Sequence, residues 1–386
     1  MIGKVPDGWR VEKVKNIVKI KKGKKVDIFE KHENGLFNYI DISVLRTQKY
    51  KYTNNNQIMA TDKDILIVWD GANSGYSSFG LNGAVGSTLA KLTLNDKKIL
   101  HTYFGKFIFS KFDYLSATSY GATIPHLQRQ MLENISVPLP PLPQQEKIVK
   151  VLDISSALIE KQKELIQKYD LFLKSKFIEM FGDPISNPMG WEVDNLKTLI
   201  LDVKNGLTRR SSKNSGDIVL KLKDIRANYV NFINLNRIKL DEKEKEKFIA
   251  EKDDLLFIRV NGNPDYVGRC AVFHGYTEPV YFNDHIMRIK VKTNKYNAVF
   301  LGYIINSQYG KNQIVKYRKT SAGQHTISQD GLERLSFYLP PIELQTKFAS
   351  IVEKTEQIKE QETKKLQHLE TLHKSLMDKA FKGEIQ

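Results

Sequence analysis

The feature that most constrains the fold is an internal repeat, because the chain matches itself when it is shifted by 200 residues. One copy begins "LPPLPQQEKIVKVLD" at Leu139, and the other begins "LPPIELQTKFASIVEK" at Leu339. A shorter echo, "PDGW" at Pro6 and "PMGW" at Pro188, lies upstream of each copy. The order of these repeats predicts a chain built as body, segment, body, segment. Identical pairs continue downstream: Glu160 and Glu360, Gln167 and Gln367, Lys174-Ser175 and Lys374-Ser375, and Phe181 and Phe381.

The proline-rich joints divide the chain into four parts. Proline is tolerated before a helix or in its first turn but not inside it, so each "LPP" marks the end of a body and the start of a helix. We place the first body at residues 1–143, the central segment at 144–183, the second body at 184–343 and the C-terminal segment at 344–386.

Both segments have the pattern of long helices. Residues 144–181 contain neither Gly nor Pro, and Gly182-Asp183-Pro184 ends the pattern. Apolar residues recur every seven positions, as in helices that pack along their length. The second segment keeps this pattern, but "KEQETKK" from Lys359 interrupts it and predicts a wet or partner-facing turn. The predicted helix-pair and partner interface comprises Val151, Leu152, Leu158, Ile159, Leu165, Ile166, Phe172, Leu173, Ile351, Val352, Ile358, Leu366, Leu369 and Leu376.

The length of these helices indicates that they are spacers. A helix of about 38 residues is roughly 57 Å long, far beyond the width of a small domain. If the halves are related by a pseudo-twofold axis, the second helix runs antiparallel to the first and returns to the first body. The alternative, two independent bodies with separate helical tails, leaves both apolar seams uncovered. We predict a mixed α/β fold: two α/β domains joined by two long antiparallel helices in a pseudo-twofold, circular arrangement.

Each body alternates short strands with turns. The first contains the apolar run "ILIVWDG" from Ile65, and the second contains "LLFIRVNG" from Leu255, each entering a turn rich in Gly and Asn. An acidic residue, Asp64 or Asp254, stands directly before each run. Further β-like pieces, together with a helical pattern in "HTYFGKFIFSKF" from His101, indicate a mixed sheet with one or two helices.

Positive charge is concentrated in the two bodies. Of the formal net charge of +16, the first body carries +8 and the second +7, whereas the two segments are nearly neutral. A basic excess of this kind predicts binding to a polyanion. The simpler alternative is that the lysine-rich surface serves solubility.

Cysteine content and hydropathy narrow the class of protein further. The single cysteine, Cys270, excludes internal disulfides and thiolate zinc clusters, and we expect it to be a small buried residue. The N-terminal residues carry no apolar signal core, and no run approaches the roughly 18 apolar residues of a membrane span. We therefore expect a cytoplasmic protein that has no membrane partner.

The repeated motifs resemble those of the specificity (S) subunits of type I restriction-modification systems. The resemblance covers essentially the whole chain. It rests on the two "LPP" helices, on their endings "KSKFIEMFGD" and "LHKSLMDKAFKGEI", and on the motifs "PDGW" and "NPMGW". It implies that each body is a target-recognition domain reading one half of a split double-stranded DNA target. The helix pair would then be a molecular ruler that sets the spacer.

The resemblance also implies partners. Two modification (methyltransferase) subunits would dock on the helix pair and bring S-adenosylmethionine to an adenine in each half-site. Restriction (translocase/nuclease) subunits would complete the complex for cleavage. The chain itself would hold no catalytic residue, metal or cofactor. It would be a non-catalytic subunit of an adenine-specific DNA methyltransferase and type I restriction endonuclease.

Candidate DNA contacts lie in polar loops, because phosphates attract Lys and Arg whereas only a few side chains reach base edges. We select the turn after each long apolar strand, the polar stretch before each helix, and the basic residues around Gly23 and Gly206. In the first body the candidates are Lys21, Lys22, Lys24, Lys25, Asn73, Ser74, Tyr76, Ser77, Ser119, Tyr120, Thr123, His126 and Arg129. In the second they are Arg209, Arg210, Lys213, Arg259, Asn261, Asn263, Tyr266, Arg269, Arg318, Lys319, Ser321, Gln324 and His325.

Several fragments imitate catalytic motifs. "NPDY" from Asn263 is close to the N-P-P-[YF] motif of adenine methyltransferases, but its third residue is Asp265 and no Gly-rich cofactor loop follows a strand. Acidic-x-Lys triplets at Asp96 and Asp241 lie in highly charged stretches without a strand-borne partner acid. The sequence therefore predicts no enzyme activity of its own. The alternative function is a coiled-coil scaffold that holds two partners apart without sequence-specific DNA binding.

Overall fold

The computed structural model describes residues 5–47, 49–121, 124–209 and 215–385. Contacts divide the chain into two compact units: unit 1 comprises Met1–Lys163 with Lys365–Gln386, and unit 2 comprises Glu164–Lys364. Each unit therefore contains one body and a part of each long helix. Among the described residues, no helix is both long enough and apolar enough to span a membrane.

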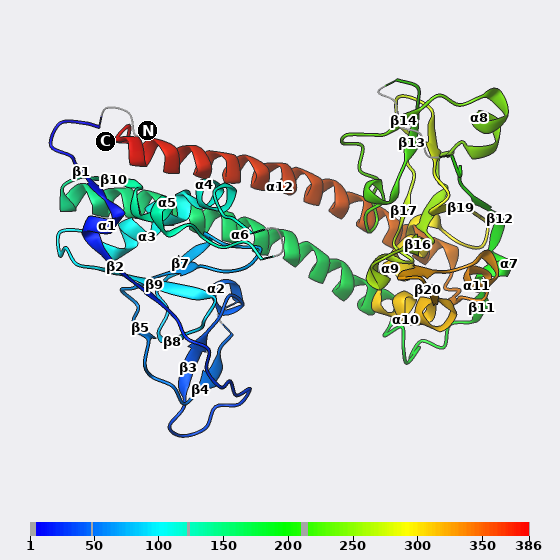
Figure 1. Cartoon of the computed structure of the whole chain (residues 1–386). Helices are drawn as coiled ribbons and strands as arrows, with labels where there is room; N and C mark the ends of the chain where they lie inside the picture. The colour runs from blue at the N-terminus through cyan, green and yellow to red at the C-terminus, as the bar shows by residue number, and fades with distance from the viewer. Residues whose placement is uncertain (1–4, 48, 122–123, 210–214, 386) are drawn as a thin grey trace. The chain divides into compact units, whose positions relative to one another are not determined.

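Both predicted long helices are present, and each is drawn unbroken in Figure 1. Helix α6 spans Leu142–Phe181 and helix α12 spans Ile342–Lys382. The turn predicted at "KEQETKK" is wrong, because α12 continues through it and Glu362 within it is only 9% exposed. A charged run without Gly or Pro keeps good helix propensity, so polarity alone does not end a helix.

The two helices run antiparallel within unit 2. Lys359 of α12 forms an ion pair with Asp170 of α6 at 2.6 Å. Farther along α6, the Phe181 ring lies 5.5 Å from that of Phe348, which comes earlier in α12. Residues later in α6 thus contact residues earlier in α12, so the two helices are antiparallel, as the sequence predicted.

Unit 1 contains the other two helix parts. Ser155 of α6 is hydrogen bonded to His373 of α12 at 2.7 Å. Nearer the ends, Ile148 of α6 shares a core with Phe381 of α12, and the ring of Phe381 packs edge-on against Tyr103 of the body. The direction is again antiparallel.

Unit 1 contains two four-stranded sheets that share no strand. The first has the order β2-β9-β6-β7 and the second β4-β3-β8-β5. A separate pair, β1 with β10, stands where the body joins the start of α6, and we call this junction the helix root. The predicted strand from Ile65 and helix from His101 are confirmed as β6 and α3. The strands are β1 Arg10–Lys13, β2 Val18–Lys22, β3 Phe37–Ile40, β4 Lys51–Thr53, β5 Met59–Ala60, β6 Ile65–Val68, β7 Ser77–Phe79, β8 Gly83–Val85, β9 Leu89–Leu94 and β10 Ser136–Leu139; the helices are α1 Val14–Ile17, α2 Val44–Thr47, α3 His101–Ser110, α4 Phe112–Ala117 and α5 Arg129–Glu133.

Unit 2 repeats this plan. Its sheet β12-β19-β15-β17 corresponds to β2-β9-β6-β7, and its pair β11-β22 corresponds to β1-β10, while β14-β13-β18 and β16-β21-β20 are three-stranded. The strands are β11 Val193–Asn195, β12 Ile200–Asn205, β13 Asp217–Leu220, β14 Arg237–Ile238, β15 Leu255–Ile258, β16 Val260–Asn261, β17 Cys270–Val272, β18 Val280–Phe282, β19 Ile286–Val291, β20 Lys319–Ser321, β21 Gln324–Thr326 and β22 Ser336–Tyr338. The helices are α7 Leu196–Leu199, α8 Glu242–Phe248, α9 Ala298–Asn306, α10 Gln308–Tyr317 and α11 Gln329–Glu333, with short 3₁₀ turns η1 Leu222–Asp224 and η2 Pro264–Tyr266.

The repeated glutamine explains why the two helix roots match. Gln145 is buried at the start of α6, where its Oε1 accepts from Leu100 N–H and its Nε2 donates to the carbonyls of Lys98 and Pro140. The Gln145 side chain is buried, so losing it would leave one backbone N–H and two backbone carbonyls without this partner. We call this arrangement the glutamine joint of unit 1.

The glutamine joint of unit 2 has the same pattern. Gln345, also buried, accepts from Asn297 N–H and donates to the carbonyls of Lys295 and Pro340. In both units the joint fixes the start of a long helix to the loop that precedes a body helix, α3 or α9.

The repeated "P-x-G-W" motif receives the other end of a helix. Gly182 follows α6 with φ +76°, and Gly383 follows α12 with φ +78°, the left-handed conformation that lets a glycine close a helix. A Cβ on Gly182 would collide with Pro188, and one on Gly383 would collide with Pro6. Each helix end therefore packs closely on the proline that opens the body of its own unit.

Candidate nucleic-acid interface

In each unit, the two loops selected from the sequence lie side by side. In unit 1, residues 69–76 meet residues 119–121 and 124–129 through a bridge between Asp70 and His126. In unit 2, residues 259–269 meet residues 318–327 where β16 pairs with β21, with Asn261 opposite His325. We call each pair of loops the polar edge of its unit. Chain segments more than forty residues apart thus build one continuous surface.

Asp70 organises the polar edge of unit 1. Its carboxylate accepts from His126 Nδ1 at 2.7 Å and pairs with Lys22 Nζ at 2.7 Å. Burial raises the pKa of Asp70, but the hydrogen bonds and charges of Lys22 and His126 outweigh burial and hold this pKa below its usual value. The ionised carboxylate thus positions two candidate DNA contacts. Sequence reasoning missed Asp70, although it stands at the end of the long apolar strand.

Tyr120 is the most prominent aromatic group on this edge. Its side chain is 59% exposed, and its ring lies 5.7 Å from the imidazole of His126. Backbone hydrogen bonds in both directions join Tyr120 and His126, so the backbone of Tyr120 is held beside that of His126. An exposed ring held in this way is suited to stacking against an unpaired base or lying against the sugar-phosphate backbone. Arg129 nearby is exposed and pairs with Glu133 at 2.7 Å.

Other candidates in unit 1 are used inside the protein. Ser74 is 1% exposed and donates to Ser119 at 2.7 Å, and Ser77 is 2% exposed. A side chain without surface cannot reach DNA, so we no longer assign Ser74 and Ser77 to the interface. Ser119 also donates to the carbonyl of Leu115, which makes it a structural residue of the loop.

Asn73 and Tyr76 lead to a residue that sequence reasoning missed. Arg46, an exposed residue of α2, donates to Asn73 Oδ1, and its guanidinium lies 5.4 Å from the centre of the Tyr76 ring. Arg46 therefore lies beside the polar edge, where its remaining N–H groups are available for a phosphate or a guanine. No repeated motif marks this arginine, so the sequence offered no signal for it.

The lysines around Gly23 form the basic margin of unit 1. Lys21, Lys22, Lys24 and Lys25 are all exposed, and Lys24 Nζ donates to Gln57 at 2.7 Å. A Cβ on Gly23 would collide with the carbonyls of Val85 and Gly86, so glycine is required for this close approach. Gly206 makes the same approach to Phe282 and Asn283 in unit 2.

The basic residues after Gly206 are less available. Arg209 donates to Glu244 at 2.6 Å and to the carbonyl of Lys239, so its charge is already partly compensated. Arg210 and Lys213 lie outside the described residues, as does Thr123 of unit 1.

A hairpin forms the outer part of the polar edge in unit 2. Its exposed side chains come from Lys319, Ser321 and Gln324, and the turn contains Ala322 and Gly323 with φ of +46° and +75°. Turns with two positive φ angles match the twist of the strands that they join. His325 faces Thr320 across the hairpin, with 2.9 Å between Nδ1 and Oγ1. The hairpin therefore presents an amide, a hydroxyl and an ammonium group on one support.

The arginines of this edge differ in their availability. Arg318 donates to the carbonyl of Pro264 at 2.9 Å, and Arg259 donates to the carbonyl of Asp284 at 3.2 Å, so both brace the loops. Arg269 instead lies over the ring of Tyr266, with 4.0 Å between its Cζ and the ring centre. Asn261 and Asn263 cap the intervening turn through their side-chain oxygens, which accept from Asn263 N–H and Asp265 N–H.

The long helices separate the predicted interface residues into two kinds. Leu152, Ile159, Leu173 and Val352 are buried, whereas Leu158, Leu165, Phe172 and Ile358 are exposed. The remaining ones, Val151, Ile166, Ile351, Leu366, Leu369 and Leu376, are partly buried. One apolar row therefore packs within the protein, and the neighbouring row is open to solvent.

Within the described ranges, no three His, Cys, Asp or Glu side chains are grouped as a metal site. Cys270 is buried, which raises the pKa of its thiol, so it packs as a small apolar residue.

Comparison with known proteins agrees with the repeat. The family model described as "Type I restriction modification DNA specificity domain" matches residues 6–168 and again residues 188–371. The chain is 29% identical over 427 residues to the type I restriction enzyme StySPI specificity subunit of Salmonella potsdam, covering 99% of this chain and 90% of that protein. It is 26% identical to the MjaVIII specificity subunit of Methanocaldococcus jannaschii, covering 99% and 94%.

The fold is also similar to that of a solved structure. The S subunit of a type I restriction-modification system from M. genitalium has a TM-score of 0.59 and 17% identity, covering 98% of each chain. The resemblance stated from the motifs is thus confirmed, and the scaffold alternative gains no support. With two matched domains that together cover most of its length, the chain belongs to the type I restriction-modification DNA specificity family.

Proposed function

We propose that the chain reads a bipartite DNA target, with one half-site bound at the polar edge of each unit. The observation that carries this proposal is the duplication itself, because each unit joins one basic body to the same helix root through a glutamine joint. Two readers on a common support are what a split target requires. Phosphate contacts would supply affinity, and a few side chains on each polar edge would supply sequence preference.

The long helices would set the spacer and dock the partners. An exposed apolar row on a soluble surface favours burial by another protein, and Leu158, Leu165 and Phe172 form such a row on α6. We propose that two methyltransferase subunits cover these helices and supply S-adenosylmethionine, and that restriction subunits join the same complex. The complex would act in the cytoplasm, and this chain would contribute recognition rather than chemistry.

The proposal is tested by co-expressing the chain with its cognate methyltransferase subunit and mapping methylated adenines across the host genome. One bipartite motif, with a methylated adenine in each half, is the expected result. Random or absent methylation from a correctly assembled complex would contradict it. A methyltransferase expressed alone is the control, because its methylation should depend on the recognition chain.

The spacer role has its own test. Inserting one heptad after Gln162 adds seven residues to α6, or about 10 Å of helix, while keeping the same helical face toward its neighbours. A matching heptad inserted after Gln361 of α12 lengthens both helices together. The gap between the methylated half-sites should then change, with both half-sequences retained. An unchanged gap in an assembled complex would remove the ruler role.

A further inference from the structure

The two units differ at one equivalent place beside their polar edges. Gly75 and Gly268 both follow a turn, and each donates its N–H at 2.8 Å to the last residue of the long apolar strand, β6 or β15. A Cβ on Gly75 would collide with Leu115 of α4, and one on Gly268 would collide with Ile314 of α10. These shared contacts align the two units. Tyr76 and Arg269, which follow the glycines, occupy corresponding positions, and so do the helix residues three before each contact, Phe112 and Lys311.

In unit 1 this place is an aromatic cluster. Tyr76, the residue after the glycine, packs edge-on against Phe109 and Phe112, with ring centres 5.8 Å and 5.9 Å away. Arg46 lies over the outer face of Tyr76. Rings occupy this place, and the cation beside them is Arg46. The cavity that Tyr76 and Phe109 do line is otherwise formed by residues of β7, α3, α6 and α12.

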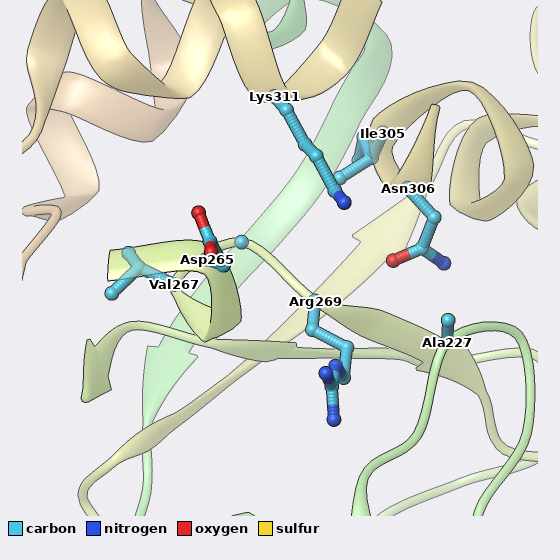
Figure 2. A pocket seen from close by; sticks show the side chains of 8 residues that line it. Ala227, Asp265, Val267, Arg269, Ile305, Asn306 and Lys311 are labelled. Carbon is cyan, nitrogen blue, oxygen red and sulfur yellow. The ribbon is translucent and has the colours of Figure 1, made fainter. Parts of the chain in front are cut away.

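In unit 2 the same place is a small cationic cavity. Arg269 replaces Tyr76 and Lys311 replaces Phe112, while Asn306 replaces Phe109 at the end of α9. The cavity measures about 80 Å³ and is also lined by Asp265. Figure 2 shows Lys311 extending from α10 toward the segment that carries Arg269, with Asn306 beside it. One water needs roughly 10–15 Å³ of such space, so the cavity has room for a group of phosphate size.

The charged groups of this cavity, Asp265, Arg269 and Lys311, do not form ion pairs with one another. Asn306 is occupied, because its amide donates to Asn228 and to the carbonyl of Cys270. Arg269 contacts the face of Tyr266. Among the described residues, no ion pair at 4.0 Å or less joins Asp265 to Lys311 or Arg269. Two cations and one carboxylate thus leave the cavity with a net positive charge.

We propose that this cavity receives a phosphate of the DNA backbone, with Lys311 as its principal cationic contact, where unit 1 has the aromatic cluster and Arg46 instead. The proposal rests on the proposed function, because Asp265 and Arg269 belong to the polar edge of unit 2. Lysine offers a compact charge with donors only, which suits a phosphate oxygen and carries no base sequence. Lys311 therefore positions the DNA rather than reading it, and Asp265 weakens the contact.

The test compares variants of the full chain, assembled with the methyltransferase, on two duplexes: the mapped target and a scrambled sequence. Lys311→Ala should lower affinity for both duplexes by about five- to tenfold at low salt and reduce the slope of log affinity against log salt by about one. The methylated sequence should stay the same. Lys311→Arg should retain most of the affinity, and Asp265→Asn should raise affinity for both duplexes.

Lys316 provides a matched control on the same helix. It lies five residues farther along α10, about 140° around the axis from Lys311, and it is also exposed. Lys316→Ala removes the same charge without touching the cavity, so its affinity should stay within about twofold of the parent chain. Equal losses from Lys311→Ala and Lys316→Ala would show a diffuse charge effect and overturn the proposal.

Neutral methylphosphonate linkages locate the contact. One such linkage in the second half-site should weaken binding by the parent chain but have no further effect on Lys311→Ala. The inference would also be overturned if no linkage position in the second half-site showed this non-additivity. It would be overturned as well if Lys311→Ala lost affinity only for the target duplex. If the parent complex itself does not distinguish target from scrambled DNA, the proposed function fails instead, and the two failures are thereby separated.

Discussion

The glutamine joints are the same in the two units, whereas the polar edges differ between them. Gln145 and Gln345 make the same three kinds of hydrogen bond to backbone groups. At equivalent places beside the polar edges, by contrast, unit 1 has an aromatic cluster and unit 2 has a cationic cavity. The supporting parts have kept their geometry, and the exposed parts have changed their chemistry. A duplicated chain whose edges diverge can recognise two different half-sites from one framework.

The largest expected effect comes from exchanging the divergent part alone. Replacing residues 184–343 with the corresponding body of another family member should replace one half of the methylated motif and leave the other half unchanged. Affinity for the original site should fall by about a thousandfold or more, the usual margin between specific and non-specific binding. Methylation mapping of the chimera checks this. A change in both halves would show that the units do not read independently.

A smaller effect should follow when the shared part is broken. Gln145→Ala leaves one backbone N–H and two carbonyls without their partner, which should lower the free energy of unfolding by about 3 kcal/mol or more. Gln345→Ala should cost a similar amount, because its bonds are the same. Chemical denaturation measures both. The exposed Gln167→Ala is the control and should change stability by less than about 0.5 kcal/mol. Very unequal losses at the two joints would contradict their equivalence.

The helix ends allow a third comparison. Gly182→Ala and Gly383→Ala should each destabilise the chain by about 1–3 kcal/mol, because alanine is strained at positive φ and its Cβ would press on Pro188 or Pro6. Thermal unfolding of the two variants gives the measurement. Gly8→Ala is the matched control: its φ is also positive, at +84°, but a Cβ there would meet nothing within 4 Å. A Gly8 loss as large as the other two would assign the effect to the backbone alone.

The smallest predicted effect separates two acidic residues at equivalent places. Burial raises the pKa of Asp64, but hydrogen bonds from Thr93 and Thr61 and the charge of Lys91 outweigh it, so this pKa lies below its usual value. Burial also raises the pKa of Asp254, and there the opposing interactions are too weak to reverse the shift. The ionised form of Asp64 therefore stabilises the fold, whereas ionising Asp254 costs free energy.

The pH dependence of this pair follows from those directions. Ionised Asp64 contributes stability above the ordinary Asp pKa of about 3.9, and loses it as the pH falls through its lowered folded value. Ionised Asp254 costs stability increasingly as the pH rises from about 3.9 through its raised folded value. Asp64→Asn should therefore destabilise at pH 7 by about 1 kcal/mol, and Asp254→Asn should be neutral or stabilising. Urea titrations from pH 4 to pH 8 check this; equal losses at pH 7 would contradict it.

Much of the architecture was predictable because the repeat preserves the residues that build it. Gln145 and Gln345 are identical residues in the two repeats, and both form the same hydrogen bonds. The glycines that end the long helices and the prolines that they pack against are also repeated in the sequence. The strands at Ile65 and Leu255 were visible as apolar runs. Heptad spacing predicted two apolar rows on α6, but periodicity alone could not say that Leu152 would be buried and Leu158 exposed.

The site was less predictable because its residues are set by tertiary contacts. Ser74 and Ser77 look like surface hydroxyls in the sequence, yet the turn folds them inward. Arg46 and Lys311 were missed because neither lies in a repeated motif, and the polar stretch chosen before the second long helix began only at Arg318. The correspondence between Phe112 and Lys311 is hidden as well, since the offset between equivalent residues varies along the bodies and only the glycine contacts reveal it.

The glutamine joint has a consequence for how such chains can change over time. Every group that is hydrogen bonded to the Gln145 or Gln345 side chain belongs to the main chain, so these bonds do not require particular side chains in the body that the joint anchors. Genetic recombination within the long helices could therefore replace one body with the body of another family member, and the new body would fit the existing helix root. A new DNA preference would then arise in one event, without a series of compensating mutations.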